Sequence, residues 1–285
     1  MFKTKPLLPF ILFAAVVSGC LGQGKSNPET AEKKHTASPQ VQVLDDSLWM
    51  PQLKRHRRIW VYLPPDYGQS DKKYPVLYMH DGQNLFDAYY AYSGEWGVDE
   101  SLDSLHAQSG FGLIVVGIDN GSDKRMNEYS PWRNKKFGHP EGAAYADFVV
   151  QTLKPLVDKT YRTLPDRRHT GIMGSSMGGL ISHYALLRYP AVFTKGGIFS
   201  PSYWFSPEVF SFTTTARLPQ HARLCFRLGG QEGKEMETHL HKMLTQLQKV
   251  GLSPASVNSR VIPEGKHHES FWRSEFPEAV LWLFE

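Results

Sequence analysis

The stretch Thr170-Gly171-Ile172-Met173-Gly174-Ser175-Ser176-Met177-Gly178-Gly179-Leu180 decides the fold of this chain. A short apolar run ends in Gly-x-Ser-x-Gly and passes into a helix-compatible segment, a pattern typical of a strand, a sharp turn and a helix with a serine at the apex. Gly174 and Gly178 suit a turn so tight that a Cβ would collide with its neighbours. The pattern predicts a nucleophile at Ser176. A plain glycine-rich turn fits the same residues, so the flanking sequence must decide between the two.

The segments around this turn alternate between strand and helix patterns. Apolar runs predict strands at 58–63, 76–80, 112–118, 170–173, 195–199, 223–228 and 257–262, and helical spacing predicts helices at 97–108, 141–161, 180–187, 235–250 and 275–283. Such alternation implies a mostly parallel sheet with helices on both faces. Reactive groups then gather at the carboxyl ends of the strands. Residues 120–139 and 200–217 show no clear pattern and are predicted to be loops or lids over a site.

Residues 1–19 have the composition of an export signal. Lys3 and Lys5 supply positive charge, residues 7–17 are apolar, and small residues precede Cys20. The apolar run is too short to span a bilayer as a helix. A cysteine directly after small residues resembles the lipobox of bacterial lipoproteins, which implies an acyl anchor on Cys20 in the cell envelope, on the periplasmic or outer-membrane face. An ordinary signal peptide that happens to contain a cysteine is the alternative.

The rest of the chain reads as a tether followed by one domain. Residues 20–40 are polar and contain two prolines, which predicts a flexible tether, and residues 41–285 are long enough for one α/β domain. The other cysteine, Cys225, lies in an apolar run and is expected in the core, so the domain has no internal disulfide. The formal net charge of +4 includes two leader lysines, and this near-neutral balance does not favour a nucleic-acid partner.

A serine nucleophile needs a histidine base and a carboxylate that orients the base. In a fold of this kind the chain order is serine, acid, histidine. No aspartate lies between Ser176 and the last two histidines, so the acid must be a glutamate. Glu232 follows the strand predicted at 223–228 and lies at a carboxyl end, where it can reach the site. Glu264 in the last loop is the alternative acid.

The base and the oxyanion donors come from two further loops. His267 and His268 follow the last predicted strand, and only one of them can be the base. The pair also raises the possibility of a metal site, but no cysteine or acidic cluster accompanies it at ligand spacing. One oxyanion donor is expected to be the N–H of Met177. The second is expected to be the N–H of Gln83, because Gly82 lets that loop turn inward. A plain Asp-Gly turn is the alternative interpretation of this loop.

With these residues in place, the chain resembles the esterase family that contains esterase D, the enterochelin esterases and bacterial feruloyl and acetylxylan esterases. The resemblance covers nearly all of residues 41–284 and includes Val61-Tyr62-Leu63-Pro64-Pro65, His80-Asp81-Gly82-Gln83-Asn84, Gly94-Glu95-Trp96, Glu128-Tyr129-Ser130-Pro131-Trp132, Ser200-Pro201-Ser202-Tyr203-Trp204 and His267-His268-Glu269-Ser270-Phe271-Trp272. In this family the histidine commonly lies five residues before a tryptophan, which selects His267, and the acid position falls on Glu232. The resemblance implies the α/β-hydrolase fold and ester hydrolysis without a metal or organic cofactor.

The substrate is expected to be a small-molecule or oligosaccharide ester. The residues expected to bind it are Asp81, Trp96, Arg125, Trp132, Tyr203 and Trp204, and Tyr89, Tyr90 and Tyr92 are further aromatic candidates for the pocket. Arg125 is expected to meet a carboxylate or catecholate, or else to pair with Glu128. An exported serine esterase acting on acylated carbohydrate or on aryl (feruloyl or acetyl) esters fits best. A siderophore esterase, an acyltransferase and a non-catalytic ligand-binding lipoprotein are the alternatives. The sequence leaves the oligomeric state open.

Overall fold

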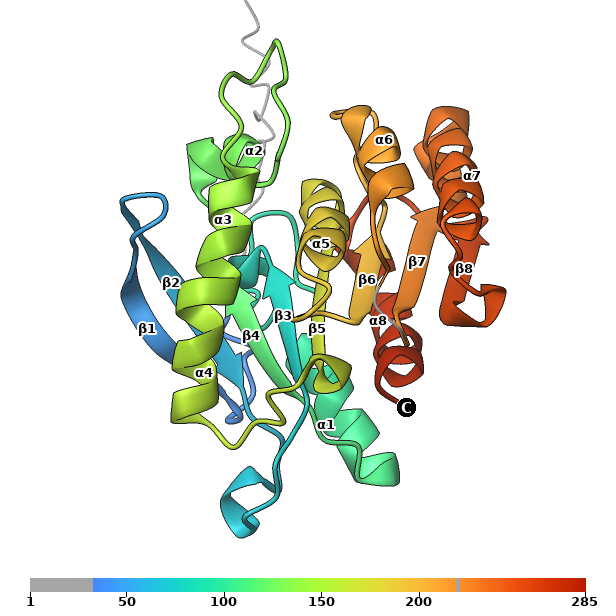
Figure 1. Ribbon diagram of the computed structural model, residues 1–285. Coiled ribbons are helices and arrows are strands. Elements are labelled where there is room, and N and C mark those ends of the chain that lie inside the picture. Colours follow the sequence, from blue (N-terminus) through green and yellow to red (C-terminus); the bar gives the residue numbers. More distant parts are fainter. Residues whose placement is uncertain (1–32, 219–220) are drawn as a thin grey trace, which may run out of the picture. The chain divides into compact units, whose positions relative to one another are not determined.

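Eight strands form one sheet, which runs through the middle of the folded unit (Figure 1). The computed structural model describes residues 33–218 and 221–285, and Lys34–Glu285 form one unit. The strands are β1 Val41–Met50, β2 Arg55–Tyr62, β3 Val76–His80, β4 Ile114–Ile118, β5 Thr170–Ser175, β6 Lys195–Phe199, β7 Arg223–Gly229 and β8 Val257–Ile262. Their order in the sheet is β1-β2-β4-β3-β5-β6-β7-β8. The β1–β2 and β2–β4 pairs are antiparallel and all the others are parallel.

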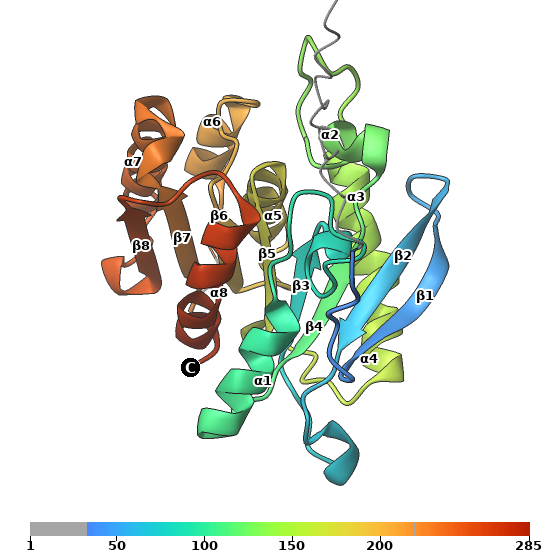
Figure 2. The same cartoon turned by 180° about the vertical axis from the view of Figure 1, so that it is seen from behind.

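Helices cover both faces of the sheet, as the two opposite views show (Figures 1 and 2). The helices are α1 Val98–Ser109, α2 Arg125–Glu128, α3 Gly142–Phe148, α4 Lys154–Thr160, α5 Met177–Arg188, α6 Glu208–Thr215, α7 Lys234–Lys249 and α8 Glu269–Phe284. Residues of α3 to α7 join one buried apolar cluster, and residues of α1 and α8 join the other. The central strands β3 and β4 are buried along their whole length, which explains their continuous apolar sequence.

The order of the strands places two loops beside each other. From β3 the chain crosses to β4 on one side, and it returns to β5 on the other side of β3. In an open α/β sheet the crevice at such a reversal, outside the carboxyl ends of the strands, is where ligands bind. The loop after β3 and the turn after β5 therefore flank one crevice.

Most of the predicted elements are confirmed, with the following differences in detail. The predicted strand at 58–63 is the second half of a hairpin, because β1 pairs antiparallel with β2. The predicted helix at 141–161 is continuous, with a π-helical turn at Val149–Leu153 between α3 and α4. The last helix begins at Glu269 rather than near 275, and the predicted loop at 200–217 contains α6. Among the described residues, no helix is both long enough and apolar enough to cross a membrane.

Part of the predicted tether is fastened to the domain. His35 Nδ1 lies 2.7 Å from Asp87 Oδ2, and the Thr36 N–H donates to the other oxygen of Asp87 at 3.1 Å. The Ser38 N–H donates to Asp99 Oδ2 at 2.7 Å. The segment 35–38 therefore belongs to the folded unit, because buried carboxylates of the domain accept its N–H groups. The predicted signal peptide and Cys20 lie outside the described residues.

Candidate active site

Ser176 lies at the apex of the turn between β5 and α5. Its φ of 59° and ψ of −121° are rare for a residue with a side chain and store strain of about 1–3 kcal/mol. The close approach of the chain explains why glycine precedes it: a Cβ on Gly174 would lie 2.9 Å from the carbonyl carbon of Gly178. Met177 is the first residue of α5, so its N–H has no partner within the helix and is available beside the serine.

Glu232 and His267 meet in a short hydrogen bond. Glu232 follows β7 and His267 follows β8, and His267 Nδ1 lies 2.6 Å from Glu232 Oε2. The Glu232 side chain is 1% exposed, whereas the His267 side chain is 41% exposed and faces a cavity. A buried carboxylate on Nδ1 places the Nδ1 proton between the two groups and leaves Nε2 as the basic nitrogen.

Two neighbours fix the orientation of Glu232. Its Oε1 accepts hydrogen bonds from the Ser200 hydroxyl at 2.6 Å and from the Gly229 N–H at 2.8 Å. Ser200 in turn accepts the indole N–H of Trp272 at 2.9 Å, and the Trp272 ring stands edge-on to His267 at 5.1 Å. These contacts hold the acid and the imidazole as one unit. The alternative acid, Glu264, is exposed and bonds Gln231 instead.

Ser176 and His267 line the same cavity without a direct hydrogen bond. Among the described residues, the partner of Ser176 Oγ is Ser202 Oγ at 3.2 Å. The Ser202 N–H also donates to the Ser176 carbonyl at 3.0 Å. In a site without substrate, a serine–histidine bond is often long or poorly aligned and tightens only when substrate binds. The fold thus joins acid and base and brings the serine to their cavity.

The two histidines do not act as a pair. The Nδ1 of His268 caps α8 by accepting the Ser270 N–H at 3.1 Å, and it does not share a partner with His267. Among the described residues, the group whose oxygens lie close enough to hold a metal ion is Glu95, Asp99 and Glu100, outside the cavity. Burial, followed by the neighbouring Glu100 charge, raises the pKa of Asp99 to about 7.

The loop after β3 carries Gln83, whose N–H is the expected second oxyanion donor. Asp81 has a left-handed φ of 57°, and Gly82 begins a single 3₁₀ turn at Gly82–Asn84. A Cβ on Gly82 would lie 2.8 Å from the backbone of Asp119, so only glycine allows this approach to β4. Gln83 follows at the cavity wall, and its side-chain oxygen accepts the Asn120 N–H at 3.1 Å.

Arg125 and Asp81 are bound to each other inside the cavity. Arg125 Nε and Nη2 donate to the two oxygens of Asp81 at 2.6 and 2.9 Å, and Asn120 Nδ2 donates to Asp81 at 2.7 Å. Burial alone would raise the pKa of Asp81, but the charge and hydrogen bonds of Arg125 outweigh burial and lower it. The expected pairing of Arg125 with Glu128 is therefore wrong, because the bidentate geometry favours Asp81.

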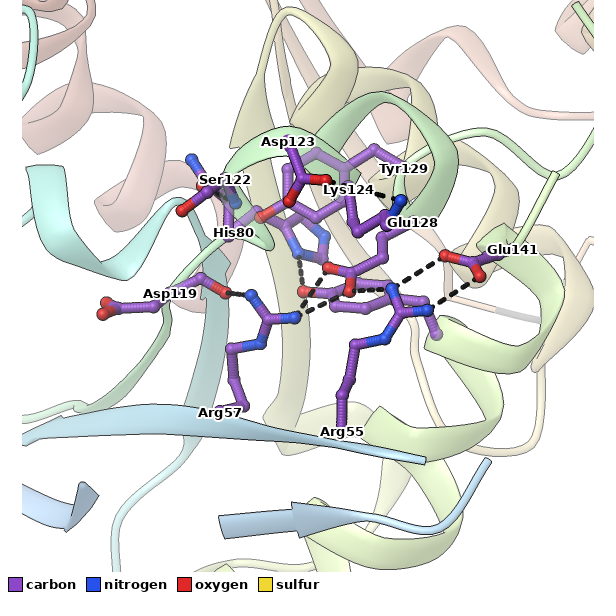
Figure 3. A network of polar contacts seen from close by, with 12 residues as sticks. Arg55, Arg57, His80, Asp119, Ser122, Asp123, Lys124, Glu128, Tyr129 and Glu141 are labelled. Atoms are coloured by element: carbon purple, nitrogen blue, oxygen red, sulfur yellow. Dashed lines mark hydrogen bonds and ion pairs between the residues drawn. The ribbon is translucent and has the colours of Figure 1, made fainter. Parts of the chain in front are cut away.

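Glu128 belongs to a separate network behind this loop (Figure 3). Both of its oxygens accept Arg57 Nη2, at 2.7 and 2.9 Å, and Arg55 Nη1 reaches it at 2.9 Å. Arg55 also forms a double hydrogen bond with Glu141. Because Glu128 ends α2, this network ties the helix that begins with Arg125 to β2 and α3.

The cavity measures about 840 Å³, within the range of small-molecule sites. Its lining residues are Asp81, Gln83, Asn84, Tyr90, Tyr92, Ser93, Trp96, Asp119, Asn120, Ser122, Arg125, Ser175, Ser176, His267, His268, Glu269 and Trp272. The predicted Asp81, Trp96 and Arg125 therefore lie in the cavity wall. Tyr90 and Tyr92, two of the further aromatic candidates, lie there as well.

Three predicted substrate contacts lie elsewhere. Tyr203 is fully buried in the core, where its hydroxyl lies 2.7 Å from His183 Nδ1. Trp132 packs edge-on against Tyr184 at 5.5 Å, and Trp204 is 47% exposed on the surface. Tyr203 and Trp132 have one cause in common: aromatic residues near strand ends also cap the apolar core, and their sequence does not separate the two uses.

The sequence interpretation missed several residues of the site. Asp119 and Asn120 directly follow β4, at a carboxyl end where polar residues were a usable signal. Glu269 gave no such signal, because its part of the chain was expected to precede the last helix. Ser200 and Ser202 were noted only as part of a family motif, and their contacts with Glu232 and Ser176 depend on the fold.

Comparison with known proteins places this site in a family context. The family model described as "Putative esterase" matches residues 51–283. An uncharacterized protein of Bacillus subtilis, YbbA, is 28% identical over 244 residues, which cover 80% of this chain and 93% of YbbA. The endo-1,4-beta-xylanase/feruloyl esterase of Xylanibacter ruminicola is 24% identical over 84% of this chain and 31% of its own length. The iron(III) salmochelin esterase of Escherichia coli is 23% identical over 79% of this chain and 54% of its own length.

Solved structures show the same fold. An IroE-like serine hydrolase from Shewanella oneidensis has a TM-score of 0.66 at 21% identity and covers 88% of this chain and 80% of its own. A ferulic acid esterase has a TM-score of 0.64 at 20% identity, covering 86% and 98%. The enterobactin esterase from Shigella flexneri has a TM-score of 0.71 at 21% identity, covering 87% and 60%. The predicted α/β-hydrolase fold, a mostly parallel sheet with helices on both faces, is confirmed.

Proposed function

This chain belongs to the esterase family and is a carboxylic ester hydrolase, and from that premise we propose that it works through an acyl-enzyme on Ser176. Ser176 Oγ forms a bond to the ester carbonyl carbon while its proton passes to Nε2 of His267. The bond to the alcohol then breaks, and the alcohol oxygen takes that proton. Water, activated in turn by His267, attacks the acyl-enzyme and releases the acid.

One observation carries this proposal above the others: the buried Glu232 carboxylate lies 2.6 Å from His267 Nδ1, on the cavity that Ser176 lines. Glu232 orients the imidazole and stabilises its charge when it gains the serine proton. The N–H groups of Met177 and Gln83 are the proposed oxyanion donors. Each donor of this kind contributes roughly 10²- to 10³-fold in rate.

The proposed substrates are acylated carbohydrates or aryl esters of the feruloyl or acetyl type. Tyr90, Tyr92 and Trp96 offer aromatic surface for a sugar face or an aryl ring, and Asn84 and Asn120 offer polar contacts for hydroxyl groups. Siderophore esters are the alternative, as the salmochelin esterase relative suggests. The two hydrogen bonds from Arg125 to Asp81 weigh against that alternative, because the guanidinium is already paired with a carboxylate of the protein instead of facing a catecholate.

The deciding experiment compares wild type with Ser176→Ala on acetyl, feruloyl and siderophore esters, together with labelling by a serine-directed fluorophosphonate. We expect Ser176-dependent hydrolysis and labelling. A protein that neither turns over any ester nor labels would be the non-catalytic ligand-binding alternative. Product analysis with an added acceptor sugar separates hydrolysis from acyl transfer, since a transferase would form the new sugar ester.

We further propose export and attachment to the bacterial membrane through lipid on Cys20. Lys3, Lys5 and the apolar residues 7–17 support this by composition, and small residues precede the cysteine. One acyl-bearing residue would anchor an otherwise water-facing domain. Mass spectrometry of the protein purified from membranes, with Cys20→Ser as control, tests this proposal. An N-terminus without acyl groups in wild type would contradict it.

A further inference from the structure

Glu269 is a carboxylate of the cavity wall that the catalytic scheme does not use. It is the first residue of α8, follows His268 directly, and is 7% exposed. It lies under the loop at Gly94, where an added Cβ would be 3.4 Å from Glu269 Cβ and 4.0 Å from Oε2. Glu269 therefore packs beneath that loop, and it lies two residues after the proposed catalytic histidine in the chain.

The other carboxylates of the cavity have partners, and Glu269 does not. Asp81 holds Arg125 and Asn120, and Asp119 accepts the Trp60 indole N–H at 2.8 Å. Among the described residues, the Glu269 carboxylate has no hydrogen-bond donor other than its own backbone N–H. Buried carboxylate oxygens are costly without donors. Because Glu269 lines the cavity, its carboxylate is free to accept hydrogen bonds from a molecule that enters the cavity.

The charges around the cavity give Glu269 a second effect. Of the described residues in the wall, Asp81, Asp119 and Glu269 carry carboxylates, and the guanidinium of Arg125 is bonded twice to Asp81. Burial, which is the largest cause, and the nearby Asp81 raise the pKa of Glu269, whereas the neighbouring His268 and His267 act to lower it. An added negative charge about 6 Å from an unpaired carboxylate weakens binding roughly 10- to 100-fold at an effective dielectric constant near 20.

We propose that Glu269 is a specificity-determining residue, which accepts hydrogen bonds from hydroxyl groups of the substrate's alcohol portion and excludes alcohols that carry a negative charge. This inference rests on the proposed esterase function. It narrows the substrate to an ester of a neutral, hydroxyl-bearing alcohol such as an uncharged sugar. Anionic esters, such as those of uronic acids or of catecholate chelates, meet an unpaired carboxylate in the same place.

The test uses two acetyl esters that differ in one group: acetylated methyl glucoside and acetylated methyl glucuronoside. We expect wild type to favour the neutral ester by at least about 10-fold in kcat/KM. Glu269→Gln keeps the shape and removes the charge, so the preference should fall about 10-fold, mainly through better turnover of the anionic ester. Glu208→Gln, an exposed carboxylate on α6, is the matched control and should keep the wild-type ratio. A ratio in Glu269→Gln within twofold of wild type overturns the proposal.

A measurement on unmodified protein guards against misfolding of the variant. With p-nitrophenyl acetate as substrate, methyl glucoside should inhibit wild type at least about 10-fold more tightly than methyl glucuronoside. Equal inhibition by the two sugars overturns the role of Glu269. If p-nitrophenyl acetate is hydrolysed in a Ser176-dependent way but neither sugar ester is, the inference on Glu269 fails and the esterase mechanism stands. If no ester is hydrolysed in a Ser176-dependent way, the mechanism itself fails.

Discussion

Replacing Glu232 by glutamine should abolish most of the activity while leaving the fold intact. The amide has one oxygen and one NH₂ group, and the surroundings decide which faces His267. Glu232 Oε1 accepts the Gly229 N–H and the Ser200 hydroxyl, and the Gly229 N–H can only donate. The amide oxygen must therefore stay at that position, and the NH₂ group turns toward His267 Nδ1, where the carboxylate oxygen now lies at 2.6 Å.

This orientation forces the wrong tautomer on His267. Facing an NH₂ group, Nδ1 must accept a hydrogen bond, so the ring proton moves to Nε2 and the imidazole cannot take the Ser176 proton. The comparable change in serine triads lowers kcat by about 10⁴-fold. Because the His267 side chain is 41% exposed and can turn toward water, we expect the loss here to be roughly 10³- to 10⁴-fold. That corresponds to about 4–5.5 kcal/mol of transition-state stabilisation.

The assay is steady-state hydrolysis of p-nitrophenyl acetate, with kcat and KM measured separately. We expect the loss in kcat, since KM reports binding in a cavity whose wall does not include Glu232. Glu264→Gln is the matched control, an exposed glutamate of the last loop that should remain within about twofold of wild type. A kcat for Glu232→Gln within 10-fold of wild type would refute the reasoning and leave a serine–histidine pair without an essential acid.

Three further changes test the supports of the site. Ser200→Ala removes a buried hydroxyl 2.6 Å from Glu232 Oε1. We expect kcat to fall roughly 10-fold at unchanged KM and the free energy of unfolding to fall by about 1–3 kcal/mol. An unchanged kcat would contradict this expectation. Glu128→Gln leaves buried arginine charge unpaired and should lower the free energy of unfolding in urea by about 3–5 kcal/mol. Glu141→Gln, at a partly exposed position, should lower it by at most about 1 kcal/mol. Equal losses in the two variants would contradict this expectation. Burial lowers the pKa of His183 in the folded protein to about 3, whereas in the unfolded chain the imidazole takes up a proton near pH 6.5. The free energy of unfolding should therefore fall by up to about 1.4 kcal/mol per pH unit as the pH drops from 6.5 toward 3. His183→Gln should flatten this acid loss, and identical pH dependence in both proteins would exclude the effect.

Local patterns predicted the catalytic geometry well. The turn at Ser176 follows from five consecutive residues, and strand ends and chain order place an acid at Glu232 and a base at His267 or His268. The choice of His267, and the preference for Glu232, came from the resemblance to the esterase family. Their catalytic roles remain predictions for the variants above.

What the sequence could not show were choices among competing partners. Arg125 had several possible acceptors along the chain. Only the fold shows that it bonds Asp81, whose backbone is left-handed. Tyr203 and Trp132 look the same in sequence as pocket residues, but in the fold Trp132 packs against Phe212 of α6 and Tyr203 against His183 of α5. β1 was missed because an edge strand is half exposed and carries polar residues that hide its period.

The backbone at Ser176 also has a practical consequence for anyone who wants to capture an ester in the cavity. Glycine would tolerate a φ of 59° without penalty, so Ser176→Gly should melt later than the native enzyme while being inert. Glycine also lets the backbone of this turn adopt other conformations, and a ligand would then meet a site of different shape. Alanine keeps the strained backbone conformation of the native turn, so Ser176→Ala is the better variant for crystallising a complex with an uncleaved ester. At this position the conformation that presents the nucleophile lowers the stability of the fold.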